Sequence, residues 1–209
     1  MNLPDDLPIL SDLDGTLIDS TDSVIAAYRW WAEFRGLSSD IVERIPFGRT
    51  STDAAAELAP HLDHHAEGRL IDHRQEENTA GVTALPGAHE LLAKHSRLAV
   101  VTACPRALAE ARLRAASLPV PQALITPDVW TRGKPDPEPY LLGAIALDAA
   151  SADCIVLEDA PAGVRAGVAA GATVIALLTT HKREDLRDAN AWIDSLRQLP
   201  AALQQLGRG

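Results

Sequence analysis

Short apolar segments that alternate with segments of helical periodicity constrain the fold more than any other feature of this sequence. They lie at residues 9–11, 98–102, 123–126, 154–158 and 173–177. Strands that are apolar on both faces are typical of a parallel sheet with helices packed on each side. The sequence therefore predicts an α/β fold with a Rossmann-like parallel sheet and an edge strand at Trp192–Ile193. The intervening periodicity predicts core helices at residues 107–116, 138–147, 162–170 and 186–190.

One long stretch departs from this alternation, because residues 19–83 show helical periodicity and no good strand. The helices expected there cover residues 21–34, 40–45, 53–62 and 65–78. Ser20 or Thr21 is expected to cap the first helix, and Gly36 to end it. The stretch therefore interrupts the sheet as an insertion after its first strand. We expect a core formed by residues 1–18 and 84–209, and an all-helical insertion formed by residues 19–83.

The composition limits the partners that this protein can have. A chain of 209 residues with 46% hydrophobic content can hold one sizeable core and a small additional module. A net charge of -10 argues against a nucleic acid or an anionic membrane as partner. Two cysteines do not indicate a disulfide framework, and no signal peptide or membrane-spanning segment is recognisable. We expect a cytoplasmic protein that is a monomer or a weak homo-oligomer.

Two aspartates, Asp12 and Asp14, follow the first apolar segment. Side chains at positions i and i+2 of a strand point to the same face. Two adjacent carboxylates are costly unless a cation lies between them or one holds a proton. Without further partners, the pair is equally compatible with a strand-ending turn that has no chemistry. Polar residues at the ends of two other predicted strands, Thr102 and the Glu158–Asp159 pair, are expected at the same sheet edge, where ligands of such sheets bind.

Four motifs in this order resemble those of the haloacid dehalogenase-like hydrolase superfamily. They are Asp12-Leu-Asp-Gly-Thr16, Thr102 at a strand end, Gly133-Lys-Pro-Asp-Pro137 and Glu158-Asp159. The resemblance covers nearly the whole chain and is greatest to the sugar-phosphatase and glycerol-phosphatase group. It implies a Mg2+-dependent phosphomonoester hydrolase that acts on a small phosphorylated metabolite, a sugar or polyol phosphate, through an aspartyl-phosphate.

The resemblance also implies a role for each motif residue. Asp12 is expected to be the nucleophile and Asp14 the general acid and base. Lys134, one of three lysines, neutralises the phosphoryl charge in a turn where a cis Lys134–Pro135 bond is expected. The Thr102 hydroxyl and the Ala103 amide are expected to bind the phosphate, and Gly15 is a further expected substrate-binding residue. The expected Mg2+ ligands are Asp12, the backbone carbonyl of Asp14, Glu158 through water, and Asp159.

In this family the helical insertion would be a cap that excludes water and selects the substrate. Arg49 in the segment Gly48-Arg49-Thr50 is the candidate substrate contact, with a solvated arginine as the alternative. The aromatic residues Trp30, Trp31 and Phe34 are expected in the core of the insertion rather than in a sugar-stacking platform. The hinges are expected near residues 16–19 and 83–87.

Two other functions remain open at this point. A phosphosugar mutase has the same core but keeps the phosphoryl group on its substrate. A non-catalytic binding protein would lack Asp12, Asp14 or Lys134, and all three are present. The sequence departs from the family pattern at Ser11, where a bulky apolar residue is usual. It departs again at Ala103-Cys104-Pro105, which leaves the details of phosphate contact open.

Overall fold

A six-stranded parallel sheet forms the centre of the molecule, as the apolar segments predict. The computed structural model describes residues 3, 4 and 6–208. The strand order is β5-β4-β1-β6-β7-β8, and every neighbouring pair is parallel. The strands are β1 (Ile9–Ser11), β4 (Leu98–Val101), β5 (Ala123–Ile125), β6 (Ile155–Glu158), β7 (Thr173–Leu177) and β8 (Ala191–Ile193). The expected edge strand at Trp192 is therefore present, and the α/β fold class is confirmed.

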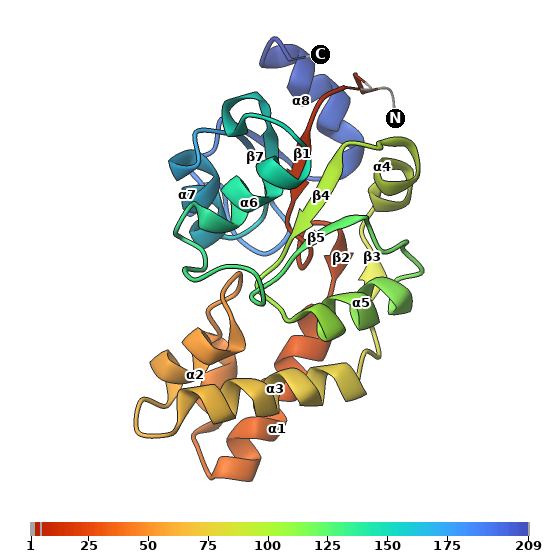
Figure 1. Ribbon diagram of the computed structural model, residues 1–209. Coiled ribbons are helices and arrows are strands. Elements are labelled where there is room, and N and C mark those ends of the chain that lie inside the picture. Colours follow the sequence, from red (N-terminus) through yellow and green to blue (C-terminus); the bar gives the residue numbers. More distant parts are fainter. Residues whose placement is uncertain (1–2, 5, 209) are drawn as a thin grey trace.

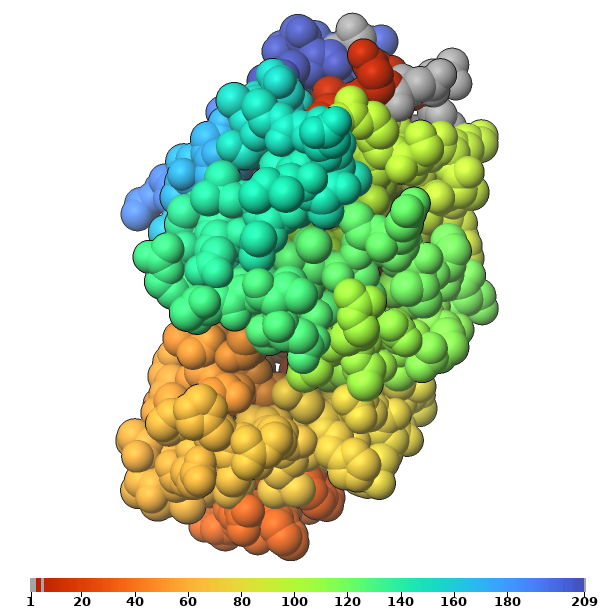
Figure 2. All heavy atoms as spheres, in the orientation of Figure 1, coloured from red at the N-terminus to blue at the C-terminus, as the bar shows by residue number. Residues whose placement is uncertain are grey.

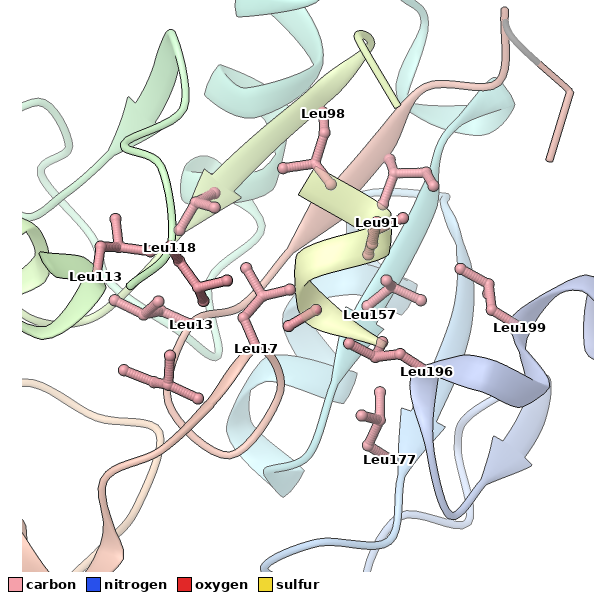
Figure 3. Close-up of a cluster of buried hydrophobic side chains, with 14 of the residues drawn as sticks. Leu13, Leu17, Leu91, Leu98, Leu113, Leu118, Leu157, Leu177, Leu196 and Leu199 are labelled. Atoms are coloured by element: carbon pink, nitrogen blue, oxygen red, sulfur yellow. The ribbon is translucent and has the colours of Figure 1, made fainter. Parts of the chain in front are cut away.

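Helices cover both faces of this sheet and create two separate apolar cores. They are α4 (Ala88–Lys94), α5 (Arg106–Ala115), α6 (Glu138–Ala146), α7 (Pro161–Ala169) and α8 (Leu199–Gln205). Successive residues of β1 point to opposite faces, so Ile9 packs in one core and Leu10 in the other. Figure 3 shows leucines of the first core, including Leu91 and Leu157, gathered beside the sheet. Within the described residues, no helix is both long and apolar enough to cross a membrane.

The insertion consists of four helical segments that leave and rejoin the sheet through two short strands. The helical segments are α1 (Thr21–Arg35), the 3-10 helix η1 (Ser39–Arg44), α2 (Ser51–Leu58) and α3 (His64–Glu77). The strands β2 (Ile18–Asp19) and β3 (Thr83–Ala84) pair in antiparallel orientation. The expectation that residues 19–83 lack a strand is therefore wrong at both ends. Figure 1 shows α1, α2 and α3 together at one end of the molecule, and Figure 2 shows that they abut the sheet part, with an indentation between the two on the left.

The helical insertion has an apolar core of its own. Trp31 is fully buried in it, together with Tyr28 and Ile71. Trp30 packs partly buried against this cluster and stacks on Phe34 at 5.3 Å between ring centroids. Phe34 itself is 59% exposed, so its expected place in the core is wrong. The insertion therefore has an apolar cluster that is separate from the two cores beside the sheet.

Most of the expected helices are present with shifted ends, and one is absent. Residues 186–190 form turns instead of a helix, because tertiary contacts bind their backbone groups. Trp192 Nε1 donates to the carbonyl of Leu186, and Asn190 exchanges two hydrogen bonds with the backbone of Val174. The expected cap at Ser20 is also different: Ser20 precedes α1, but its side chain makes no cap hydrogen bond. Helices α4 and α8 and the 3-10 helices η2 (Ser151–Asp153) and η3 (Leu196–Gln198) were not expected.

The buried carboxylate of Glu67 connects α3 to α1. It accepts hydrogen bonds from Trp31 Nε1 at 2.7 Å and from Arg35 Nε and Nη2 at 2.8 and 2.7 Å. Burial raises the pKa of Glu67, but the hydrogen bonds from Arg35 and Trp31 outweigh it. The pKa of Glu67 therefore lies below its ordinary value of 4.5.

Replacing this carboxylate tests how much it stabilises the insertion. We expect Glu67→Gln to lower the free energy of unfolding by about 1–3 kcal/mol, because charge-assisted hydrogen bonds to Arg35 are lost. The difference from wild type should shrink as the pH falls through the lowered pKa of Glu67, since the wild-type carboxylate is then protonated. Urea denaturation at pH 7 and below pH 4.5 measures both effects. Glu77→Gln on the exposed face of the same helix is the control, and an equal loss there would contradict the assignment.

Candidate active site

The carboxyl ends of three neighbouring strands bring the predicted motifs together. Asp12 follows β1, Thr102 follows β4, and Glu158 ends β6 with Asp159 directly after it. Since β4, β1 and β6 are adjacent in the sheet, these residues meet at one edge. All four are buried, and the Asp12 amide donates to the carbonyl of Leu157 at 2.9 Å. Residues that lie 90 to 147 positions after Asp12 in the sequence therefore share one site with it by topology alone.

Lys134 lies at the centre of this arrangement. Its Nζ donates to Asp12 Oδ1 at 2.8 Å, to Glu158 Oε1 at 2.7 Å and to the carbonyl of Val101 at 3.0 Å. Burial lowers the pKa of Lys134, but the charges of Asp12 and Glu158 outweigh it and raise the pKa above its ordinary value. The ammonium group therefore stays charged, with all three protons donated. The Lys134–Pro135 peptide bond is cis, as the sequence predicts.

The carboxylates of Asp12, Glu158 and Asp159 form the acidic part of the site. One oxygen from each lies within 4.8 Å of the others. Burial, with the neighbouring carboxylates adding to it, raises the pKa of Asp12 to about 7 and that of Asp159 well above its ordinary value. The single positive charge of Lys134 therefore does not neutralise all three carboxylates. A hard divalent cation with oxygen ligands fits this donor set, because it would supply the missing positive charge.

Glu158 differs from the other two carboxylates in its contacts. Its Oε1 accepts from Lys134 Nζ and from the Tyr140 hydroxyl at 2.8 Å, and its Oε2 accepts from the amides of Asp159 and Ala160 at 3.0 Å each. A carboxylate with four donors has little capacity left for a direct metal bond. That Glu158 would bind the metal through water stays a prediction.

The side chain of Asp14 points toward the insertion rather than into the acidic cluster. Its Oδ1 accepts from Ser20 Oγ at 2.6 Å, and its Oδ2 accepts from Arg112 Nη1 at 2.8 Å. The side chain is 27% exposed and lines the pocket beside Asp12. Asp14 is therefore placed where a proton can pass to or from a group that enters the pocket.

Gly15 allows the turn after the first strand to pass close to the acidic cluster. Its φ is +78°, a conformation that favours glycine. A Cβ at this position would lie 2.1 Å from Asp159 Oδ2. Thr16 Oγ1 donates to Asp159 Oδ1 at 3.2 Å. Any side chain at this position would therefore clash with Asp159. The expected role of Gly15 in substrate binding stays a prediction.

The segment after β4 contains the departures from the family pattern. Thr102 Oγ1 accepts from the amide of Cys104 at 3.2 Å, and Thr102, Ala103 and Cys104 all line the pocket. Burial raises the pKa of the Cys104 thiol, so the thiol stays protonated at neutral pH. Ser11, the other departure, is buried and donates from its hydroxyl to the carbonyl of Asp12 at 2.7 Å. The Ser11 departure therefore removes no catalytic group from the site.

A pocket of about 70 Å³ lies between the sheet edge and the insertion. Asp12, Asp14 and Asp159 line it from the sheet side, and Gly48 and Arg49 line it from the insertion. Arg49 is paired with Glu57 at 2.9 Å and with Asp53 at 3.8 Å, and its side chain is 34% exposed. The structure thus brings Arg49 to the same pocket as the nucleophile candidate.

Several pocket residues were not expected from the sequence: Ser20, Tyr28, Asp72, Gln75 and Arg112. A signal for Arg112 was present, because it stands three residues after Ala109 and four after Leu108 on the apolar face of its helix. An arginine at a core position needs a partner. The insertion residues gave no comparable signal, because their positions depend on how α1 and α3 pack against the sheet.

Comparison with known proteins places the chain in a family. The family model for haloacid dehalogenase-like hydrolases matches residues 9–177. Hexitol phosphatase A from Escherichia coli is 37% identical over 95% of both chains. Glycerol-1-phosphate phosphohydrolase 1 from Saccharomyces cerevisiae is 31% identical over 86% of this chain and 77% of its own. The crystal structure of a hydrolase from Pseudomonas syringae superposes with a TM-score of 0.84 at 24% identity, over 95% of this chain and 98% of that one.

The chain therefore belongs to the haloacid dehalogenase-like hydrolase family, as its four motifs predict. The named relatives are phosphatases, which supports the predicted enzyme class, a phosphatase. The likeness to the Pseudomonas syringae structure shows the fold alone.

Gly163 in α7 offers a test of how strictly the Lys134–Glu158 pair is positioned. A Cβ at Gly163 would lie 1.6 Å from Glu158 Oε1, so Gly163→Ala must displace the carboxylate. We expect kcat/KM for an aryl phosphate to fall by about 100-fold, because a shift of about 1 Å at a positioned group has that cost. A continuous phosphatase assay measures this loss, with circular dichroism as the check on folding.

Gly133→Ala is the matched control for this substitution. Its Cβ would meet only Trp130 Nε1 at 3.5 Å, an ordinary contact. We expect little change in activity there. A folded Gly163→Ala variant with the same activity as the control would show that the position of Glu158 is unimportant.

Proposed function

We propose that this protein is a Mg2+-dependent phosphomonoester hydrolase that acts on small sugar or polyol phosphates through an aspartyl-phosphate. The observation that carries the proposal is the buried Asp12 carboxylate, which Lys134 holds at 2.8 Å beside the acidic cluster. The relatives named hexitol phosphatase A and glycerol-1-phosphate phosphohydrolase 1 support the substrate class.

The metal would be held by the side chains of Asp12 and Asp159, the backbone carbonyl of Asp14, and Glu158 through water. It would neutralise the charge between the nucleophile and the incoming phosphoryl group. Lys134, which donates to Asp12 Oδ1 at 2.8 Å, contributes to the same neutralisation. The Thr102 hydroxyl and the Ala103 amide would bind the phosphoryl oxygens at the end of β4.

In the first step, an oxygen of Asp12 attacks phosphorus, and the bond from phosphorus to the ester oxygen breaks. Asp14 gives its proton to the departing alcohol oxygen. In the second step, water attacks phosphorus, the bond from phosphorus to the Asp12 oxygen breaks, and Asp14 takes a proton from that water. Inorganic phosphate leaves, and the Asp12 carboxylate is regenerated. Asp14 lines the pocket beside Asp12, as both proton transfers require.

Residues 19–83 would serve as a cap over residues 1–18 and 84–209. The pocket lies where the two parts meet, and its lining comes from both. A closed cap excludes bulk water from the aspartyl-phosphate and fixes the substrate in line. The chain crosses between the parts at β2 and β3, which coincide with the expected hinges.

A phosphosugar mutase would share the first step and return the phosphoryl group to its substrate. Within the described residues, no specific observation favours it over hydrolysis. Measuring inorganic phosphate release against isomer formation separates the two activities.

The nucleophile assignment is tested by Asp12→Asn. We expect the Mg2+-dependent hydrolysis of an aryl phosphate to fall by more than about 10³-fold, because the attacking oxygen is removed. Chelation with EDTA should abolish wild-type activity, and added Mg2+ should restore it. Asp22→Asn at an exposed position of α1 is the control. Substantial activity of a folded Asp12→Asn variant would end the assignment.

The role of Arg49 is tested by comparing two kinds of substrate. We expect Arg49→Ala to raise KM about tenfold for the best sugar or polyol phosphate of a panel, since a hydrogen bond to a charged group is lost. The rise should be smaller for an aryl phosphate, which has no hydroxyl groups for Arg49 to contact. Arg44→Ala, at an exposed position of η1, is the control. Equal rises for both substrates would remove Arg49 from substrate recognition.

A further inference from the structure

Arg112 is a buried arginine that joins the sheet part of the molecule to the insertion. It lies on α5 and is only 3% exposed. Its Nη1 donates to Asp14 Oδ2 at 2.8 Å, and its Nη2 donates to Gln75 Oε1 on α3. Burial lowers the pKa of Arg112, but Asp14 above all outweighs it, so the guanidinium stays charged. A full positive charge is therefore held where the two parts of the molecule meet.

The third nitrogen of this guanidinium, Nε, makes no hydrogen bond. Arg112 Nε is the one buried side-chain nitrogen or oxygen without a hydrogen bond in the described part of the chain. A buried donor without an acceptor costs about 1–3 kcal/mol, so its retention needs an explanation. Arg112 lines the pocket that also contains Asp12. An acceptor atom of a bound molecule would satisfy the free donor.

The insertion contributes side chains to the same pocket that accept and donate hydrogen bonds. Asp72 and Gln75 come from α3, and Tyr28 comes from α1. Asp72 Oδ1 accepts from Ser51 Oγ at 2.6 Å, and the carboxylate retains lone pairs for further donors. Burial raises the pKa of Asp72 to about 6, so it remains largely ionised at neutral pH. An alcohol group, which both accepts and donates, matches side chains of this kind.

The charged side chains that line the pocket indicate which charge the leaving group of the bound molecule carries. The positive charge of Arg112 is paired with Asp14, and the negative charge of Asp72 also stabilises it. Arg49, the other arginine in the pocket lining, is paired with Glu57 and Asp53. Both pocket arginines are thus already matched by carboxylates. A carboxylate or second phosphate on the leaving group would face Asp14 and Asp72 without a free cation, whereas a neutral group would meet no repulsion.

We propose that Arg112, Asp72 and Gln75 form a subsite that binds the hydroxyl groups of a neutral polyol leaving group. This inference rests on the proposed phosphatase function and names the part of the substrate that the site selects. Arg112 Nε donates to one hydroxyl oxygen, and Asp72 accepts the proton of another. The phosphoryl group lies in the same pocket, beside Asp12.

The test compares three esters that differ in their leaving groups. They are a hexitol monophosphate, an aryl phosphate without hydroxyl groups, and 2-phosphoglycolate, whose leaving group carries a carboxylate. We expect Arg112→Lys, which keeps the charge but loses Nε, to lower kcat/KM for the hexitol ester about tenfold more than for the aryl ester. Most of that difference should appear in KM. Arg114→Lys, 64% exposed on the same helix, is the control and should change neither value.

Asp72→Asn is the second variant, because it is isosteric and avoids any loss of folding at Arg112. We expect it to lower the hexitol preference over the aryl ester and to raise the relative kcat/KM for 2-phosphoglycolate, since a repelling charge is removed. If Arg112→Lys does not fold, Asp72→Asn decides alone. Equal losses for the hexitol and aryl esters in the folded variants would overturn the subsite.

Assays of the wild-type protein distinguish a failure of this inference from a failure of the proposed function. Hydrolysis of 2-phosphoglycolate in preference to the hexitol ester would overturn the neutral leaving group and leave the phosphatase assignment intact. Release of phosphate from none of the three esters, with Mg2+ present, would overturn the proposed function and this inference together.

Discussion

The buried contact between Lys134 and two carboxylates, Asp12 and Glu158, is the interaction on which the site depends. The ammonium group donates all three protons inside the protein, so its position is fixed from three directions. Tyr140 and two backbone amides hold Glu158 in turn. A buried charge is tolerated only when it is paired and hydrogen-bonded in this way. The nucleophile candidate is thus oriented by the fold before any substrate binds.

Much of this arrangement could be predicted from the sequence, because it follows from topology. Asp12, Thr102 and Asp159 end apolar strands, and a parallel sheet places such ends at one edge. Lys134 was predictable from its motif, although no strand or helix positions it. In these cases local sequence and overall fold agree, which is the condition under which a pattern is informative.

The contacts that the sequence did not predict arise where separate elements pack together. The Ser20 hydroxyl, expected as a helix cap, donates to Asp14 instead. The helix expected at residues 186–190 is replaced by turns, because Val174 and Trp192 bind its backbone and side chains. The pairing of Arg112 with Gln75 depends on how α3 lies against α5. Periodicity describes one element at a time, so it contains no information about such partners.

The pairing of β2 with β3 has a consequence for the evolution of this protein. The insertion leaves and re-enters the sheet through two neighbouring strands, and it contains its own apolar core. Its sequence can therefore diverge with little effect on the packing of the sheet. The pocket lining that comes from the insertion could therefore be remodelled while Asp12 and Lys134 are retained. Arg112 limits that freedom, because any new partner on α3 must still accept a hydrogen bond from a guanidinium that the sheet side holds in place.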